Sequence, residues 1–273
     1  MNRRRYYCFA ILSGLLICAT FSLLYSRPIC FTYKDEFTNN KIKILYWNTF
    51  FGDENFSFGQ GYISKNCPIH NNCFFTYNEC IGHEESYDLI IFHGMDKELF
   101  STKLPEKRKP NQKYVFVALE SPANKYLPEP SLFDDYFNLT MTYHLDSDIV
   151  WSYADVQEIE TNEIIVPSKN PKWKNYTGNI RIPEVDKIIL NKSKIGAWYV
   201  SNCRSKSGRE KLFDDLKQYL SVSKFGQCSE ENGCKRGDDC FKTVVEPEYF
   251  FYFAFENSLC KDYVTEKLFT SLQ

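Results

Sequence analysis

The sequence lacks an excess of charge of either sign. It has 33 lysines and arginines against 35 aspartates and glutamates, a formal net charge of −2. No global basic field is therefore present to hold a polyanion, which argues against nucleic-acid binding. The chain also has no internal repeat and no low-complexity tract, and its 43% hydrophobic and 25% charged residues are close to the average of folded proteins. This composition excludes a collagen-like or disordered chain.

Long hydrophobic runs are scarce as well, and a multi-span membrane protein is excluded because only one run could cross a bilayer. Residues 6–26 are uncharged, and about 20 such residues span the ~30 Å hydrocarbon core as a helix. Three arginines precede this run and only Arg27 follows it closely, so the positive-inside bias predicts a cytosolic tail at 1–5 and a lumenal remainder. A cleaved signal peptide is the alternative, but the length of the run favours an anchor.

Histidine is rare, with four in the chain, and the eleven cysteines lack the short C-x2–4-C spacing that zinc sites favour. We therefore expect disulfides, including local loop staples within 67–80 and within 228–240. The cysteines that follow the hydrophobic run are Cys30, Cys67, Cys73, Cys80, Cys203, Cys228, Cys234, Cys240 and Cys260. Because this number is odd, at least one thiol stays unpaired or forms a disulfide-linked dimer.

An oxidising lumen is also consistent with the glycosylation signals. Four Asn-x-Ser/Thr sequons occur, at Asn55, Asn138, Asn175 and Asn191. Each is weak alone, but they agree with the cysteine content and with the orientation of the predicted anchor.

After a polar stem at 27–40, the pattern alternates between strands and helices. Short apolar runs predict strands at 41–48, 87–94, 113–122, 195–202, 222–228 and 249–258. Helical spacing predicts helices at 208–220, begun by a Ser207-x-x-Glu210 capping box, and at 262–272. A polar, proline-containing stretch at 158–194 is the expected interdomain region. The sequence thus predicts an α/β protein with two Rossmann-like units.

Polar clusters follow three of the predicted strands, at the sheet edge where such folds bind ligands. They are Glu120-Ser121-Pro122, then Ser201-Asn202 with Arg209, and then Glu256-Asn257-Ser258 with Tyr263, Glu266 and Lys267. Arg209 and Lys267 have the charge to neutralise a diphosphate, and Glu266 can accept hydrogen bonds from a ribose. The alternative is that these are ordinary surface charges of helices.

The segment FAFENSLCKDYVTEKL (253–268) resembles the hallmark block of the α1,3/4-fucosyltransferases, glycosyltransferase family 10. Supporting matches, in the order of that family, are ALESP (118–122), FNLTMTYHLDSDI (137–149) and WYVSNC followed by Arg209 (198–209). The cysteine loop at 228–240 and Cys260 resemble invertebrate members of the family more than vertebrate ones. The resemblance covers about 41–273.

This resemblance implies a single-pass type II Golgi membrane enzyme of GT-B fold. An acceptor-side domain at 41–190 and a GDP-fucose-binding domain at 191–273 would transfer fucose from GDP-fucose to N-acetylglucosamine of glycoprotein or glycolipid glycans, in α1,3 linkage and with inversion. Glu120 would be the general base, and Arg209 and Lys267 would stabilise the leaving diphosphate. The residues that would shape the donor site are Asn202, Glu256, Asn257, Tyr263 and Glu266.

No obligatory metal is expected. Asp146-Ser147-Asp148 matches the Asp-x-Asp metal clamp of GT-A glycosyltransferases. In the family that this chain resembles, however, the same triplet lies in the acceptor half and clamps no donor metal.

Members of that family continue past the Glu-Lys helix, so the resemblance implies an incomplete second unit. We expect little fucosyl transfer from residues 27–273 alone. A catalytically inactive, truncated Golgi-lumenal binding or adaptor protein is the alternative to an enzyme.

Overall fold

A computed structural model describes residues 41–62, 72–77, 83–95, 99, 104–124, 133–175, 178, 182–229 and 239–272. The predicted cytosolic tail, membrane span and stem, residues 1–40, lie outside this part. Within the described part, no helix has both the length and the apolar character needed to cross a membrane.

The chain divides into two compact units, Met1–Val115 and Phe116–Gln273. The first unit contains β1 (Ile42–Tyr46), β2 (Gly61–Tyr62), β3 (Cys73–Thr76) and β4 (Leu89–His93), and the division falls inside β5 (Lys113–Ala118). The strands of the second unit are β6 (Leu139–Thr142), β7 (Ile149–Val150), β8 (Val156–Gln157), β9 (Ile164–Val166), β10 (Lys194–Tyr199), β11 (Val222–Phe225) and β12 (Tyr249–Tyr252). Its helices are α3 (Pro183–Asn191), α4 (Arg209–Lys217), α5 (Glu246–Glu248) and α6 (Glu266–Phe269).

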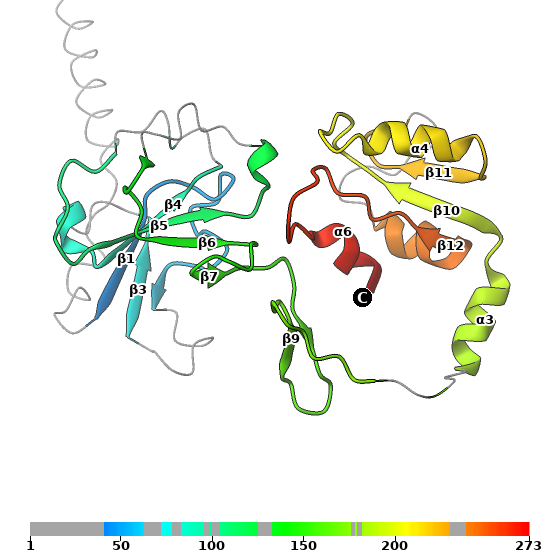
Figure 1. Cartoon of the computed structure of the whole chain (residues 1–273), viewed down its shortest axis with the longest axis horizontal. Coiled ribbons are helices and arrows are strands. Elements are labelled where there is room, and N and C mark those ends of the chain that lie inside the picture. The colour runs from blue at the N-terminus through cyan, green and yellow to red at the C-terminus, as the bar shows by residue number, and fades with distance from the viewer. Residues whose placement is uncertain are drawn as a thin grey trace, which may run out of the picture. The chain divides into compact units, whose positions relative to one another are not determined.

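The larger sheet has the strand order β2-β3-β1-β4-β5-β6-β7. Strand β1 lies between β3 and β4 and pairs in parallel with both, which confirms the strands predicted at 41–48 and 87–94 (Figure 1). The apolar runs of these strands are buried, with Leu45, Tyr46 and Ile90 at 0% exposure. Burial of consecutive side chains is what a parallel strand covered on both faces requires.

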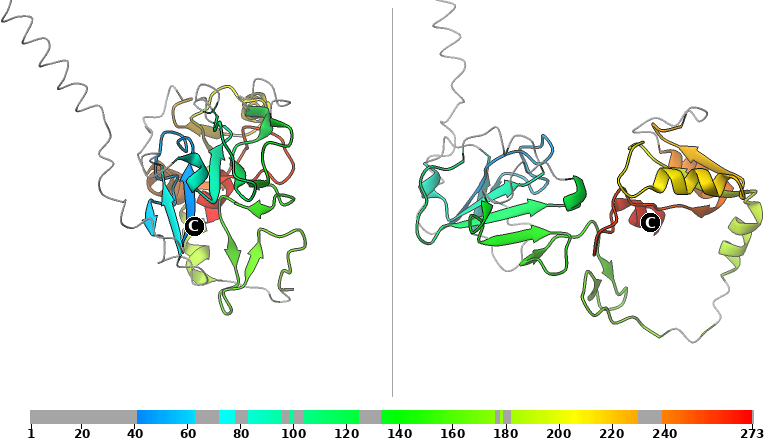
Figure 2. Two further views of the ribbon diagram at one scale, coloured as in Figure 1. Left: turned by 90° about the vertical axis from the view of Figure 1, so that its left-hand side faces the viewer. Right: turned by 45° about the horizontal axis from the view of Figure 1, so that its top comes forward.

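The smaller sheet, with order β11-β10-β12, is parallel throughout. Side chains alternate along β10, so its two faces meet different partners. Trp198 packs with Phe213 of α4 on one face. Ala197 packs on the other with Val245, which belongs to a π-helical segment, Phe241–Val245. Figures 1 and 2 show these helical segments on opposite sides of the sheet.

The topology of this sheet marks a ligand position. From β10 the chain runs through α4 to β11 on one side, and it later returns to β12 on the other side. The strand order therefore reverses at β10. In open α/β sheets, the crevice at the carboxyl end of such a strand is where ligands bind.

Several local expectations need correction. The capping box at Ser207 is wrong: the residue before α4 is Gly208, at φ 74°, and Glu210 instead accepts hydrogen bonds from the Ser205 backbone and hydroxyl. The strand predicted to reach residue 258 ends at Tyr252. The helix predicted from 262 begins at Glu266, because the preceding turn includes Asp262 in the left-handed region, at φ 61°.

The polar stretch predicted as an interdomain region is more structured than expected. It contains α3 and, together with the residues just before it, the antiparallel β8–β9 pair. Strand β3, also not predicted, is only four residues long and lies in a cysteine- and asparagine-rich segment.

The disulfides differ from the predicted pattern. Cys228 bonds to Cys203, 25 residues earlier, and not to a cysteine of its own loop. A staple within 228–240 is therefore wrong for Cys228. Cys240 is disulfide-bonded, and Cys260 is not. Cys30, Cys67, Cys80 and Cys234 lie outside the described residues.

Candidate functional site

A cavity of about 690 Å³ opens at the carboxyl ends of β10 and β12, within the second unit. This volume lies inside the ~300–1,000 Å³ range of small-molecule sites. Six of the eight site residues predicted from the sequence line it: Glu120, Asn202, Arg209, Asn257, Glu266 and Lys267. Glu256 and Tyr263 do not line it, but both bond to residues that do.

Glu120 is half-buried after β5, where its carboxylate is held through one oxygen. Oε2 accepts hydrogen bonds from the Tyr263 hydroxyl at 2.8 Å, from Asn124 Nδ2 at 3.1 Å and, more weakly, from Asn257 Nδ2 at 3.5 Å. No described residue donates to Oε1. The carboxylate is thus fixed and still has an oxygen available to accept a proton.

Tyr263 lies in the turn before α6 and is 5% exposed. Its ring packs edge-on against that of Tyr143, with centroids 4.9 Å apart. Burial, followed by the proximity of Tyr153 and Glu120, holds the pKa of Tyr263 far above the ordinary tyrosine value. The hydroxyl therefore stays protonated and remains a donor.

Arg209 begins α4, where it is 4% exposed. Its guanidinium donates to the backbone carbonyls of Phe255, at 2.8 Å, and Asn202, at 2.9 Å. Its Nε lies 3.4 Å from Glu210 Oε1. Arg209 therefore joins the loop after β10 to the segment after β12, and it contributes positive charge to the cavity wall.

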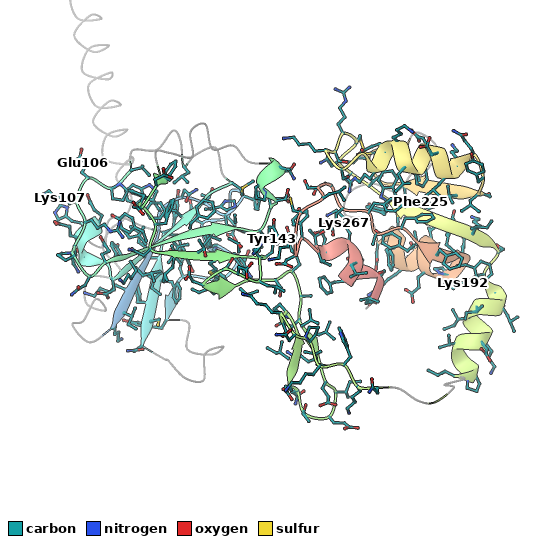
Figure 3. The ribbon with its side chains drawn as sticks, in the orientation of Figure 1. Glu106, Lys107, Tyr143, Lys192, Phe225 and Lys267 are labelled. Carbon is teal, nitrogen blue, oxygen red and sulfur yellow. A yellow bond between two sulfur atoms is a disulfide. The ribbon has the colours of Figure 1, made fainter. Side chains whose placement is uncertain are left out.

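Lys267 extends from the first turn of α6 (Figure 3) and bonds to side chains only. Its Nζ donates to Thr265 Oγ1 at 2.7 Å and to Glu266 Oε1 at 2.8 Å, and it lies 3.3 Å from Glu256 Oε2. Glu256 in turn accepts from the Thr265 backbone N–H, which precedes α6, at 2.8 Å. Glu256 thus supports the start of α6 from behind the wall.

The two asparagines of the wall have different tasks. Asn202 organises its own loop, since its Oδ1 accepts from the Arg204 backbone N–H. Asn257 Oδ1 is buried and has no hydrogen-bond partner within the described part of the chain. A buried amide oxygen without a partner is costly unless a ligand or water pairs with it, so Asn257 is suited to contact a ligand.

Other wall residues were not predicted from the sequence, among them Tyr199, Asp239, Phe241, Tyr252 and Thr270. Tyr199 and Tyr252 are the last residues of β10 and β12. The strand-end rule, that ligands bind at the carboxyl ends of the strands, would have found them if it had also been applied to the last residues of the strands themselves. Burial, and then nearby Glu266 and Glu256, raise the pKa of Tyr252 to about 12. Asp239 lies at the end of the cysteine loop (228–240) and Phe241 directly follows it, in a stretch where no sequence signal indicates a site.

The wall carries three carboxylates, on Glu120, Asp239 and Glu266, and two cations, on Arg209 and Lys267. The Asp-Ser-Asp triplet is elsewhere and its carboxylates are already bonded. Asp146 pairs with Lys169 and Lys261, and Asp148 accepts from Thr140. The described residues include no cluster of three or more side chains that could hold a metal ion.

Together these features define a class of protein, an α/β protein with a polar ligand cavity at the switch point of a parallel sheet. Comparison with known families supplies the narrower assignment. The model of "Fucosyltransferase, N-terminal" matches residues 39–154, and that of "Glycosyltransferase family 10 (fucosyltransferase) C-term" matches residues 189–273. The chain belongs to glycosyltransferase family 10, the fucosyltransferases.

Individual relatives agree with this assignment. The chain is 35% identical over 239 residues to alpha-(1,3)-fucosyltransferase C of Drosophila melanogaster, covering 84% of this chain and 55% of the relative. It is 32% identical to alpha-(1,3)-fucosyltransferase fut-1 of Caenorhabditis elegans, covering 84% of this chain and 45% of the relative. The chain thus spans about half the length of these relatives.

Proposed function

We propose that this chain carries the chemistry of an α1,3-fucosyltransferase, moving L-fucose from GDP-fucose to an N-acetylglucosamine unit of a glycoprotein or glycolipid glycan. The observation that supports this most is the convergence of Glu120, Arg209 and Lys267 on one cavity at the β10 switch point. The names of the relatives supply the donor sugar and the linkage.

In the proposed inverting step, the acceptor hydroxyl oxygen attacks the anomeric carbon of fucose. The bond from that carbon to the diphosphate oxygen breaks as the new glycosidic bond forms. Glu120 takes the hydroxyl proton, and GDP leaves with the electron pair of the broken bond. The Oε1 atom of Glu120, which receives no hydrogen bond from the described residues, is the proton acceptor.

Arg209 and Lys267 stabilise the negative charge that develops on the leaving diphosphate. The Asn257 Oδ1 atom, buried without a partner among the described residues, accepts a hydrogen bond from the donor. Glu266, whose side chain is 61% exposed, accepts from the ribose hydroxyls. No step in this scheme requires a metal ion.

We propose a GT-B arrangement with an acceptor-side domain at 41–190 and a donor domain at 191–273. The protein would be a single-pass type II protein of the Golgi membrane with its catalytic part in the lumen. A disulfide-linked dimer stays a prediction, for which Cys260, not in a disulfide, supplies a thiol.

The test is to measure GDP-fucose binding and fucosyl transfer by the purified lumenal part, extended at its C-terminus to the length of a relative because residues 27–273 alone are expected to transfer little. The assay uses radiolabelled donor with N-acetyllactosamine and N-glycan core acceptors. Glu120→Gln should keep donor affinity within about twofold and lower transfer by about 10²–10⁴, the usual cost of losing a general base. Asn138→Gln, a change at an exposed sequon, is the matched amide control. Glycan or protein binding without any GDP binding would favour an inactive binding protein instead.

A further inference from the structure

The turn that contains Tyr263 is fixed to the turn after β6 by its neighbours. The Asp262 carboxylate accepts from the Leu145 backbone N–H at 3.2 Å and lies 3.7 Å from His144 Nδ1. Lys261 Nζ lies 2.8 Å from Asp146 Oδ2. Asp262 has a positive φ of 61°, a conformation that residues other than glycine adopt uncommonly. These contacts indicate that the segment after β6 holds the turn in position.

Fixing this turn also fixes the Tyr263 side chain. Tyr263 is the residue after Asp262, and its ring packs against that of Tyr143. Tyr143 is the residue before His144, in the turn after β6 that Asp262 contacts. Figure 3 shows Tyr143 beyond the end of β6. This packing places the Tyr263 hydroxyl 2.8 Å from Glu120 Oε2, behind the cavity wall.

We propose that Tyr263 is a positioning residue for Glu120: its hydroxyl holds Oε2 so that Oε1 faces the acceptor hydroxyl, and the Asp262 turn holds the Tyr263 hydroxyl in place. This inference rests on the proposed role of Glu120 as the base. It changes the expected task of Tyr263 from contacting the donor to orienting the carboxylate.

Hydrogen bonds donated to a carboxylate fix its position. The groups that face Glu120 are Tyr263 and Asn257 from the segment before α6, Asn124 from the segment after β5, and the buried Tyr153 and Tyr143. The charged groups that share its cavity are Arg209, Asp239, Glu266 and Lys267. Of the groups bonded to the carboxylate, Tyr263 makes the shortest contact, so its removal should free the carboxylate to turn the most.

The central experiment compares the parent with Tyr263→Phe, which keeps the ring and removes the oxygen. We expect kcat to fall about tenfold with KM for GDP-fucose within twofold, because the base loses its orientation while the contacts to the donor stay. The control is Tyr249→Phe, which loses a buried hydroxyl that donates to Ser223 Oγ, outside the cavity. The control should leave both kcat and KM unchanged.

A second readout needs no activity. In protein with 13C-labelled glutamate carboxyl groups, the Glu120 signal is assigned by its loss in Glu120→Gln. At one fixed neutral pH, its chemical shift should differ between Tyr263→Phe and the parent, because the carboxylate loses the hydrogen bond from the Tyr263 hydroxyl. If neither protein transfers fucose, the proposed function fails, but this comparison still decides the positioning role. Equal chemical shifts in parent and variant would overturn the inference.

The turn is tested separately at Asp262. Asp262→Ala removes the acceptor for the Leu145 N–H and should change the Glu120 carboxyl chemical shift in the same direction as Tyr263→Phe does. Asp262→Asn keeps an oxygen acceptor and should restore the parent chemical shift. A chemical shift in Asp262→Ala equal to that of the parent would show that the turn does not position Tyr263.

Discussion

The corner formed by β10 and α4 and the corner formed by β12 and α6 each supply one cation to the cavity, and they hold it in opposite ways. Arg209 is 4% exposed and donates to two backbone carbonyls, whose positions are fixed by the fold. Lys267 has a side chain that is 21% exposed, and its partners are the side chains of Thr265, Glu256 and Glu266.

This difference separates a structural cation from one that can change partners. The guanidinium cannot leave the Phe255 and Asn202 carbonyls without leaving them unpaired, which is costly for buried groups. The ammonium of Lys267 can exchange the exposed Glu266 carboxylate for a ligand phosphate with little loss. The charge of Arg209 should therefore be constant, whereas that of Lys267 becomes available when an anion binds.

The largest effect is expected from Arg209→Met, which retains the stem of the side chain. It should lower the free energy of unfolding by about 3 kcal/mol, because two acceptors lose their donors. Urea denaturation followed by tryptophan fluorescence measures this, since Trp198 lies 5.5 Å from the guanidinium carbon. Lys267→Met is the matched control and should change stability by less than about 1 kcal/mol. Equal losses of stability in Arg209→Met and Lys267→Met would show that the two corners do not hold their cations in different ways.

A smaller effect, on binding alone, is expected from Lys267→Met. A hydrogen bond to a charged group contributes about 1.5–3 kcal/mol, so GDP affinity should fall at least about tenfold. Isothermal titration with GDP measures the change, and Lys211→Met, on an exposed face of α4 outside the cavity lining, is the control. Unchanged GDP affinity in Lys267→Met would show that Lys267 remains paired with Glu256 and Glu266 when GDP binds.

The two corners also differ in how far the sequence predicted them. The β10–α4 corner follows the expected strand, loop and helix closely, because its apolar periodicity matches regular elements. At the β12–α6 corner the strand ends earlier than predicted and the helix begins later than predicted. The residues between them, Phe253–Thr265, form an irregular segment held by side-chain contacts, and periodicity carries no signal for such contacts.

The same limit applies within the site. The strand-end rule and the family resemblance predicted six residues of the wall. They did not separate Tyr263 and Glu256, which lie behind the wall, from Glu266 and Lys267, which lie on it. That separation depends on tertiary packing, such as Tyr263 on Tyr143, between residues more than a hundred positions apart.

The smallest effect concerns the pH dependence of the β10–α4 corner, through Glu210. Partial burial acts to raise the pKa of Glu210. Hydrogen bonds from its own backbone N–H and from Ser205 and Arg209 outweigh burial and hold the pKa below the ordinary value of 4.5. A carboxyl whose pKa is lowered by folding stabilises the protein above its unfolded pKa, and this contribution is lost as pH falls through the folded value.

We therefore expect the parent to lose slightly more stability than Glu210→Gln as the pH falls from about 6 to below 4.5, by less than about 1 kcal/mol. Denaturation midpoints measured across this range in both proteins check the difference. Parallel curves for the parent and for Glu210→Gln would show that the loop around Ser205 is held without the Glu210 charge.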